Sequence, residues 1–344
     1  MNEKRENWLD IIKALGIICM VFEHAYIYMF STNYFYVPIF WIIAGYVFKN
    51  VSIKIFLWKK IKRLYIPFVI CNIVCFILPQ LLPNLLPITY HLGFYENLKS
   101  FIDILCFNIL SSMAAPTWFI FALFITNIEF LVIYKISRVY KTYQDIILFI
   151  CCLIMSLIGI IYRNYFNQYI YGNCSIITIM FYSMFFYCLG YLLKKYSIKM
   201  FIDKYYEIKY GVSAVSIISI IILNYDCYRV GYRTFNLNMG FPALIVPIMG
   251  FIIFFVLAEL IIKKNILKRI MNYIGKNTLY ILLYHILCFQ IIGIIQLKYA
   301  GFSLDNVLNS WICISAVGFW KYMAAILGIC LPIGVRYLLN MYLK

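Results

Sequence analysis

A lysine and a histidine occur in the first apolar segment of this chain, where ionisable side chains are rare. Lys13 and His24 are eleven residues apart. In a helix, eleven residues return to within roughly 20° of the starting direction after a rise of about 16 Å. The two side chains therefore follow one stripe of a predicted helix. Ionisable side chains in hydrocarbon usually line a polar path, so this stripe marks where a substrate or cofactor enters the membrane.

Two acidic residues accompany this pair. Asp10 falls near the same stripe, and Glu23 directly precedes His24. Burial disfavours a charged imidazolium, so a neutral His24 that can accept a proton is the expected resting form unless Glu23 or Asp10 offsets this effect. A neutral histidine is a general base, and we predict a catalytic group of His24, Glu23 and Asp10. The alternative is a histidine that only bonds helices together, but Lys13 on the same stripe favours the catalytic interpretation.

A basic cluster follows the second apolar segment and consists of Lys59, Lys60, Lys62 and Arg63. Its simplest interpretation is attraction to anionic lipid at the inner surface. Such a cluster can also hold the phosphates of a cytosolic nucleotide cofactor. Lys60 and Arg63 are three residues apart, hence neighbours on one helix face, and could bind one anion together.

Polar residues in later segments complete the set of candidates. Trp118 closely follows Pro116, and Thr278 and His285 lie in the ninth apolar segment. His285 would lie about 13 Å above the inner surface, where it could line the same cavity as Lys13. A packing role for His285 is an equally good interpretation.

Membrane helices must position these residues, because the composition excludes a soluble domain. Of 344 residues, 65% are hydrophobic and 12% are charged. The sequence therefore predicts an all-α integral membrane protein with about ten transmembrane helices. The expected spans are 11–30, 37–48, 64–82, 116–134, 146–162, 174–193, 211–224, 240–262, 278–297 and 311–335.

The net charge of +17 reflects topology rather than nucleic-acid binding. With the N-terminus inside and ten alternating spans, 24 of the 30 Lys and Arg fall on the inner side. This asymmetry predicts that both termini are cytoplasmic. The twelve cysteines show no metal-ligand spacing, so we predict no metal site.

Two segments between spans have an amphipathic helical pattern. Residues 53–64 are expected to lie along the inner membrane surface in contact with lipid, and residues 98–109 at the outer surface. No linker or internal repeat interrupts the chain, which favours one membrane domain over 1–344. No sequence pattern specifies an oligomeric state.

Several motifs in order resemble the membrane-bound acyltransferase 3 family, bacterial O-acyltransferases that modify cell-surface glycans. The matching stretches are WLDIIKALGI at 8–17, VFEH at 21–24, VPIFWIIAGY at 37–46, KKIKRLYIPF at 59–68, PTWFI at 116–120 and GKNTLYILLYH at 275–285. Each motif is loose by itself, but together they cover nearly the whole chain.

The resemblance implies a multi-pass protein of the bacterial inner (plasma) membrane. It would take an acyl group from cytosolic acetyl-CoA, or another acyl-CoA, and transfer it to a hydroxyl of a glycan or lipid-linked sugar. The family's functional histidine corresponds to His24, and the basic residue eleven positions earlier corresponds to Lys13. The expected donor-binding residues are Lys13, Lys59, Lys60, Arg63, Trp118, Thr278 and His285.

The chain departs from the family pattern at several places. Lysine stands at position 13 instead of the usual arginine, and Lys60 pairs with Arg63 where two arginines are usual. Lysine keeps the charge but loses the planar fork that binds phosphate through two hydrogen bonds. Tyr36 stands where many members have histidine, the acidic segment that larger members carry near Trp118 is absent, and no extracytoplasmic hydrolase-like domain is present. These differences bear more on the choice of acceptor than on the type of reaction.

Two other functions compete with acyl transfer. A transporter or flippase for a lipid-linked sugar or small acid would use His24 and Glu23 as a proton relay, but it predicts broken helices in symmetric halves, which the sequence does not show. A non-catalytic sensor built on the same scaffold is the other alternative. Within acyl transfer, His24 could deprotonate the acceptor or become acylated itself, and both roles are open to histidine.

Overall fold

The computed structural model describes residues 7–27, 36–81, 94–166, 173–197, 206–225, 242–301 and 318–342. In these ranges the regular structure is helical and includes no strand. Seven of the described helices are long and apolar enough to cross a membrane, which confirms the prediction of an all-α membrane protein. They are Ile53–Leu81, Met113–Ser137, Gln144–Tyr162, Ile177–Lys195, Ala243–Ile262, Thr278–Ala300 and Phe319–Met341.

The helices at the other three predicted spans are shorter or more polar. Helix α1 (Asn7–His24) has 18 residues and carries Asp10, Lys13 and Glu23. Helix α2 (Tyr36–Tyr46) has 11 residues, about 16 Å of rise against a hydrocarbon core of about 30 Å. Helix α10 (Tyr206–Tyr225) has a short apolar stretch at Tyr210–Ile220. Seven of the ten predicted spans are therefore matched by long apolar helices among the described residues, and the other three stay predictions.

The helices form two compact units, each assembled from distant parts of the sequence. The first contains Met1–Gly16, Phe30–Ile55 and Ala122–Gly275. The second contains Ile17–Met29, Phe56–Phe121 and Lys276–Lys344. Four of the described helices contribute residues to both units, namely α1, α3 (Ile53–Lys60), α6 (Trp118–Ser137) and α12 (Asn265–Lys276).

In the first unit, α2 crosses α8 (Asn173–Lys195) so closely that their backbones touch. A Cβ atom at Gly45 would overlap the backbone of Tyr187, and one at Gly190 would overlap the backbone of Ile42. Small residues allow this approach, which membrane helices use because lipid supplies no hydrophobic force between them. Most of α2 is buried as a result, which explains why it is apolar on all sides.

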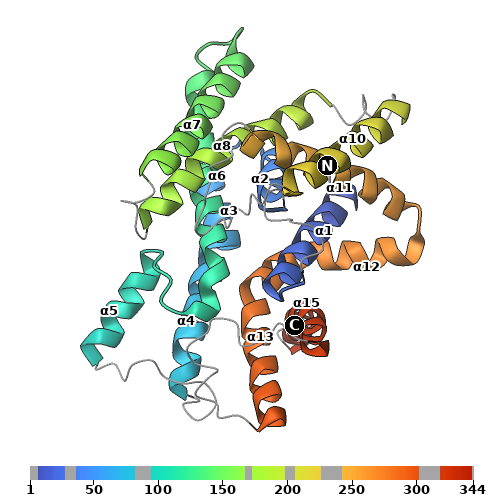
Figure 1. Ribbon diagram of the computed structural model, residues 1–344. Coiled ribbons are helices and arrows are strands. Elements are labelled where there is room, and N and C mark those ends of the chain that lie inside the picture. Colours follow the sequence, from blue (N-terminus) through green and yellow to red (C-terminus); the bar gives the residue numbers. More distant parts are fainter. Residues whose placement is uncertain are drawn as a thin grey trace. The chain divides into compact units, whose positions relative to one another are not determined.

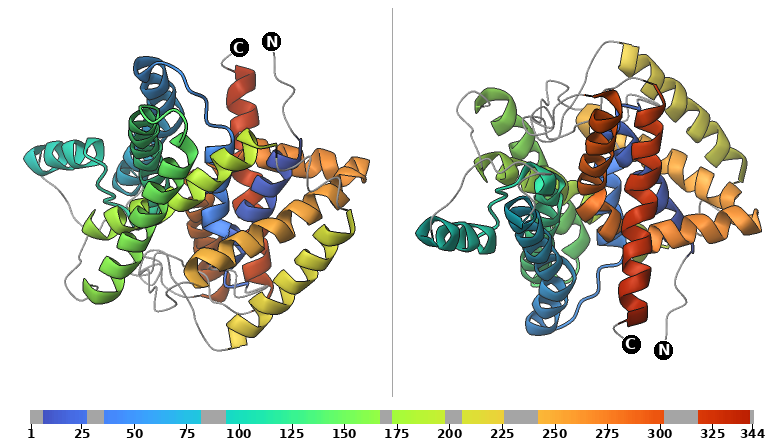
Figure 2. Two further views of the ribbon diagram at one scale, coloured as in Figure 1. Left: turned by 90° about the horizontal axis from the view of Figure 1, so that it is seen from above. Right: turned by 90° about the horizontal axis from the view of Figure 1, so that it is seen from below.

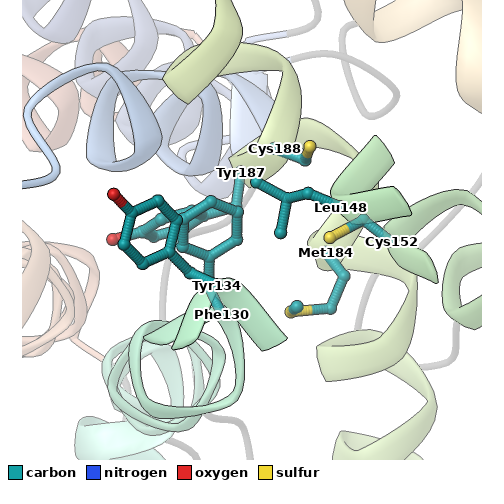
Figure 3. Close-up of a cluster of buried hydrophobic side chains, with 7 residues drawn as sticks. All are labelled: Phe130, Tyr134, Leu148, Cys152, Met184, Tyr187 and Cys188. Carbon is teal, nitrogen blue, oxygen red and sulfur yellow. The ribbon is translucent and has the colours of Figure 1, made fainter. Parts of the chain in front are cut away.

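A cluster of buried side chains joins α6, α7 (Gln144–Phe166) and α8 in the same unit. Helices α7 and α8 lie side by side (Figure 1). Two interhelical hydrogen bonds reinforce the cluster, from the Tyr187 hydroxyl to Asn127 Oδ1 at 2.7 Å and between the hydroxyls of Thr126 and Ser183 at 2.7 Å. The cluster itself, shown in Figure 3, consists of Phe130, Tyr134, Leu148, Cys152, Met184, Tyr187 and Cys188.

The start of α1 is fixed by aromatic and backbone contacts in the first unit. The Trp8 ring meets Tyr46 of α2 and Phe255 of α11 (Pro242–Ile262) edge to face. Gly275, in the last turn of α12 (Asn265–Lys276), lies against the backbone of Asp10, where a Cβ atom would overlap it. The first turns of α1 are thus held rigidly around Asp10.

In the second unit, α3 continues through a π-helical turn, η2 (Ile61–Tyr65), into α4 (Ile66–Leu81). The turn closes when Ile66 N–H donates to Ile61 O, five residues earlier. Pro67 follows and has no N–H to give its fourth preceding residue, Arg63, so a wider turn suits this position. The predicted helix over 53–64 is present, but it continues into the next predicted span as the first part of the 29-residue helix Ile53–Leu81; its place at the membrane surface stays a prediction.

Helix α5 (Phe94–Leu105) follows the amphipathic pattern predicted for residues 98–109, although it ends four residues earlier. Leu98, Ile102 and Leu105 form an exposed apolar row on it. Such a row suits the membrane interface.

Helix α13 (Thr278–Ala300) packs against several elements of the second unit. It lies beside α15 (Phe319–Tyr342), as both views of Figure 2 show. It also meets α4, where the Cys71 thiol donates to Leu283 O at 3.2 Å, and the 3₁₀ turn η3 (Ser112–Thr117). Asn72 of α4 donates to the Thr117 hydroxyl at 3.1 Å. Side chains of α13 that face α15, α4 or η3 are therefore closely packed against these elements.

The glycine contacts between α2 and α8 predict a difference between two Gly→Ala variants. Gly190→Ala should destabilise the protein by about 1–3 kcal/mol, several degrees in melting temperature, because the added methyl group forces α2 and α8 apart. Gly211→Ala is the matched control, since no atom lies within 4 Å of its added Cβ and alanine favours the helix. Thermal unfolding in detergent checks this, and equal melting temperatures for the two variants would contradict the close crossing.

Candidate active site

His24 is the last residue of α1, six residues before the predicted end of the first span. The chain turns away through Tyr26, whose φ of 58° is left-handed, while Ile27 N–H donates to Phe22 O at 2.8 Å. The carbonyl end of a helix carries partial negative charge, which stabilises a cation formed at His24. This partial charge offsets part of the cost that burial imposes on a protonated His24.

His24 is hydrogen-bonded to a second histidine from the far end of the sequence. Its Nδ1 lies 2.8 Å from Nε2 of His285 in α13. The two ring planes differ by 9°, with centroids 5.1 Å apart. His285 is fully buried, whereas His24 is partly exposed. The pair therefore has one enclosed imidazole and one that is accessible from outside the protein core.

The surroundings of His285 hold its ring in one orientation. Its Nδ1 lies 2.9 Å from Ile281 O and 3.0 Å from Leu282 O, both in the preceding turn of α13. The Phe289 ring meets it nearly at right angles, at 5.6 Å between centroids. His285 was expected among the donor-binding residues, but its direct bond to His24 favours a role at that imidazole.

The predicted acidic residues lie in different settings. Asp10 is 2% exposed and forms an ion pair of 2.5 Å with Lys13, which is 21% exposed. Asp10 precedes His24 by fourteen residues, about 21 Å along the helix, so it is placed to hold Lys13 and not to contact the imidazole. Glu23 is partly buried beside His24 in sequence. Nδ1 of His24 is hydrogen-bonded to His285.

The basic cluster lies where α3 passes into η2. Lys59 and Arg63 are exposed, and the amine of Lys60 sits 5.1 Å from the centre of the Phe56 ring. Lys60 and Arg63 are close enough for their charges to repel each other. An anion between them would relieve this repulsion, so the cluster suits a phosphate group.

Helix α4 connects the basic cluster to the histidine pair. Arg63 lies eight residues before Cys71, about 12 Å along the helix. Cys71 touches α13 at Leu283, two residues before His285. The cluster and the pair therefore lie on helices of one unit that are in direct contact.

The two remaining predicted residues stand at the beginnings of helices. Trp118 opens α6, partly buried and edge-on to Phe119. Thr278 opens α13 directly after Asn277.

Arg336 of α15, which is not among the predicted site residues, also lies at the start of α13. It donates to Asn277 Oδ1 at 2.5 Å, and its guanidinium carbon lies 4.2 Å from the centre of the Tyr280 ring. No sequence signal links these residues, because they come from helices about sixty positions apart.

A comparison with protein families identifies the class of protein. The sequence model described as an acyltransferase domain matches residues 6–335, nearly the whole chain. The chain therefore belongs to the acyltransferase 3 family and is a multi-pass membrane acyltransferase. Searches of curated proteins and of solved structures gave no match.

The Asp10–Lys13 pair predicts non-additive effects on stability. Asp10→Asn and Lys13→Met should each destabilise the protein by about 1–3 kcal/mol, because each leaves a charge that has lost its partner in a mostly buried site. The double variant should lose less than the sum of the two. Melting temperatures of the four proteins in detergent measure this coupling, and strictly additive losses would show that the ion pair contributes nothing.

Proposed function

We propose that this membrane acyltransferase is an O-acetyltransferase. It moves an acetyl group from cytosolic acetyl-CoA to a hydroxyl of a cell-surface glycan or lipid-linked sugar, at the inner membrane of a bacterium. The observation that carries the proposal is the hydrogen bond from His24 to His285 at the end of α1, in a chain of this family. The motifs between residues 8 and 285 support one catalytic domain over 1–344, and the distribution of Lys and Arg supports cytoplasmic termini.

His24 serves as the general base in this proposal. Its imidazole takes the proton of the acceptor hydroxyl while the hydroxyl oxygen attacks the thioester carbonyl carbon. The carbon–sulfur bond then breaks, and the leaving thiolate takes the proton back from His24. A route through acylated His24 uses the same nitrogen as the nucleophile. Both routes conserve protons and need no further reactant.

The donor would be held by cations on the inner side. Lys60 and Arg63 suit the phosphates of the nucleotide because their charges lie close together. Lys13, held by Asp10, adds a cation about 16 Å along α1 from His24. Coenzyme A is a phosphorylated nucleotide joined to a thioester by a thin flexible arm, which suits an elongated site of this kind. Trp118 and Thr278 complete the proposed donor site.

His24→Ala should abolish acetyl transfer, with a loss of at least about 10²-fold, because it removes the proposed general base. The measurement is transfer of radiolabelled acetyl groups from acetyl-CoA in detergent, where no gradient can drive transport. Size-exclusion profiles and melting temperatures show whether the variant folds. Undiminished transfer by folded His24→Ala would refute the assignment, and a wild type that transfers nothing in detergent would favour a transporter.

Arg63→Ala should raise the KM for acetyl-CoA by roughly tenfold and change kcat little, since it removes binding shared by ground and transition states. Lys54→Ala is the control, because Lys54 is an exposed cation of α3 outside the basic cluster. Steady-state kinetics with varied acetyl-CoA checks this. An equal rise in KM for both variants would indicate a general effect of positive charge.

A further inference from the structure

The position of one hydrogen in the histidine pair follows from the backbone. Nδ1 of His285 lies 2.9 Å from Ile281 O and 3.0 Å from Leu282 O. Carbonyl oxygens only accept hydrogen bonds, so Nδ1 must carry the proton. A neutral imidazole has one N–H, and the lone pair of His285 is therefore on Nε2.

This lone pair determines the tautomer of the other histidine. Nε2 of His285 lies 2.8 Å from Nδ1 of His24, so Nδ1 of His24 must be the donor. The ring planes differ by 9°, which lets the N–H bond and the acceptor lone pair lie in nearly one plane. The lone pair of a neutral His24 is consequently on Nε2.

The reverse arrangement is energetically unfavourable. If His285 donated from Nε2, its Nδ1 lone pair would face two carbonyl oxygens. His285 is 0% exposed, so bulk water does not reach the ring to relieve that repulsion. The burial of His285 thus enforces one direction of donation through the pair.

The packing around His285 supports this fixed direction. Phe289 covers one side of the ring and in turn lies against Gly328 of α15, where a Cβ atom would meet the Phe289 ring at 2.6 Å. The same Cβ would lie 3.3 Å from a methyl group of Val21, three residues before His24. Gly328 of α15 therefore packs against both α1 and α13 next to the histidine pair.

We infer that His285 is a positioning residue that fixes His24 as the Nδ1–H tautomer and presents Nε2 as the reacting nitrogen. This inference rests on the proposed acyl transfer. A carboxylate has the corresponding place in Ser–His–Asp triads, where it orients the imidazole and stabilises the imidazolium. Here the buried neutral imidazole of His285 accepts the hydrogen bond from His24. Its own N–H group donates to two backbone carbonyl oxygens.

Two variants of matched size test the inference. His285→Gln keeps an oxygen acceptor near the position of Nε2, whereas His285→Met has nearly the same length and only a weakly accepting sulfur. His285→Met should lower kcat about 10²-fold with the KM for acetyl-CoA unchanged, and His285→Gln should restore at least about a tenth of the wild-type kcat.

Nitrogen-15 NMR of ring-labelled histidine in detergent reads the tautomer without any need for activity. Wild-type His24, assigned by comparison with His24→Gln, should be protonated at Nδ1, and His285→Met should lose this preference. Wild-type His24 protonated at Nε2, or full kcat in folded His285→Met, would overturn the inference. If the wild type transfers no acetyl group, the proposed function fails, while the tautomer measurement still decides the inference.

Discussion

The hydrogen bond between His24 and His285 is the contact on which the proposed chemistry depends. It joins residues 261 positions apart and brings the end of α1 against the inner face of α13. Two imidazoles in an apolar setting are costly unless each N–H has an acceptor. The backbone carbonyls of Ile281 and Leu282 meet that requirement at one end. The fold thus supplies a directed pair of polar groups where hydrocarbon would otherwise exclude them.

The remainder of the second unit keeps this pair in place and connects it to the inner-side cations. Helix α4 follows directly after the basic cluster of α3 and η2 and touches α13 through Cys71, close to His285. The π-helical turn η2 falls within the cluster, as such turns often do at functional sites. Within the first unit, Lys13 is held by Asp10, whose backbone Gly275 approaches closely. Lys13, a proposed donor contact, and His24, the proposed base, both belong to α1.

The sequence was sufficient for the class of protein and for the candidate residues, but not for their pairing. Length and apolarity predicted most of the long helices, and the motif around His24 predicted the family that residues 6–335 match. The His24–His285 contact was missed because periodicity within one helix does not show which residues of another helix it meets. The start of α4 was also misjudged, since the π-turn before Pro67 joins a basic amphipathic segment to a span without a break. Helix α2 is apolar on all sides, and its sequence does not distinguish burial within protein from contact with lipid because both give this pattern.

An experimental structure with a non-transferable thioether analogue of acetyl-CoA tests the central claim most directly. We expect the acyl carbonyl carbon to lie within about 6 Å of His24 Nε2, a distance that leaves room for one hydroxyl oxygen between them. We also expect the nucleotide phosphates to contact Lys60 and Arg63. An acyl end bound far from His24, with the imidazole pair facing lipid or packed protein, would contradict it.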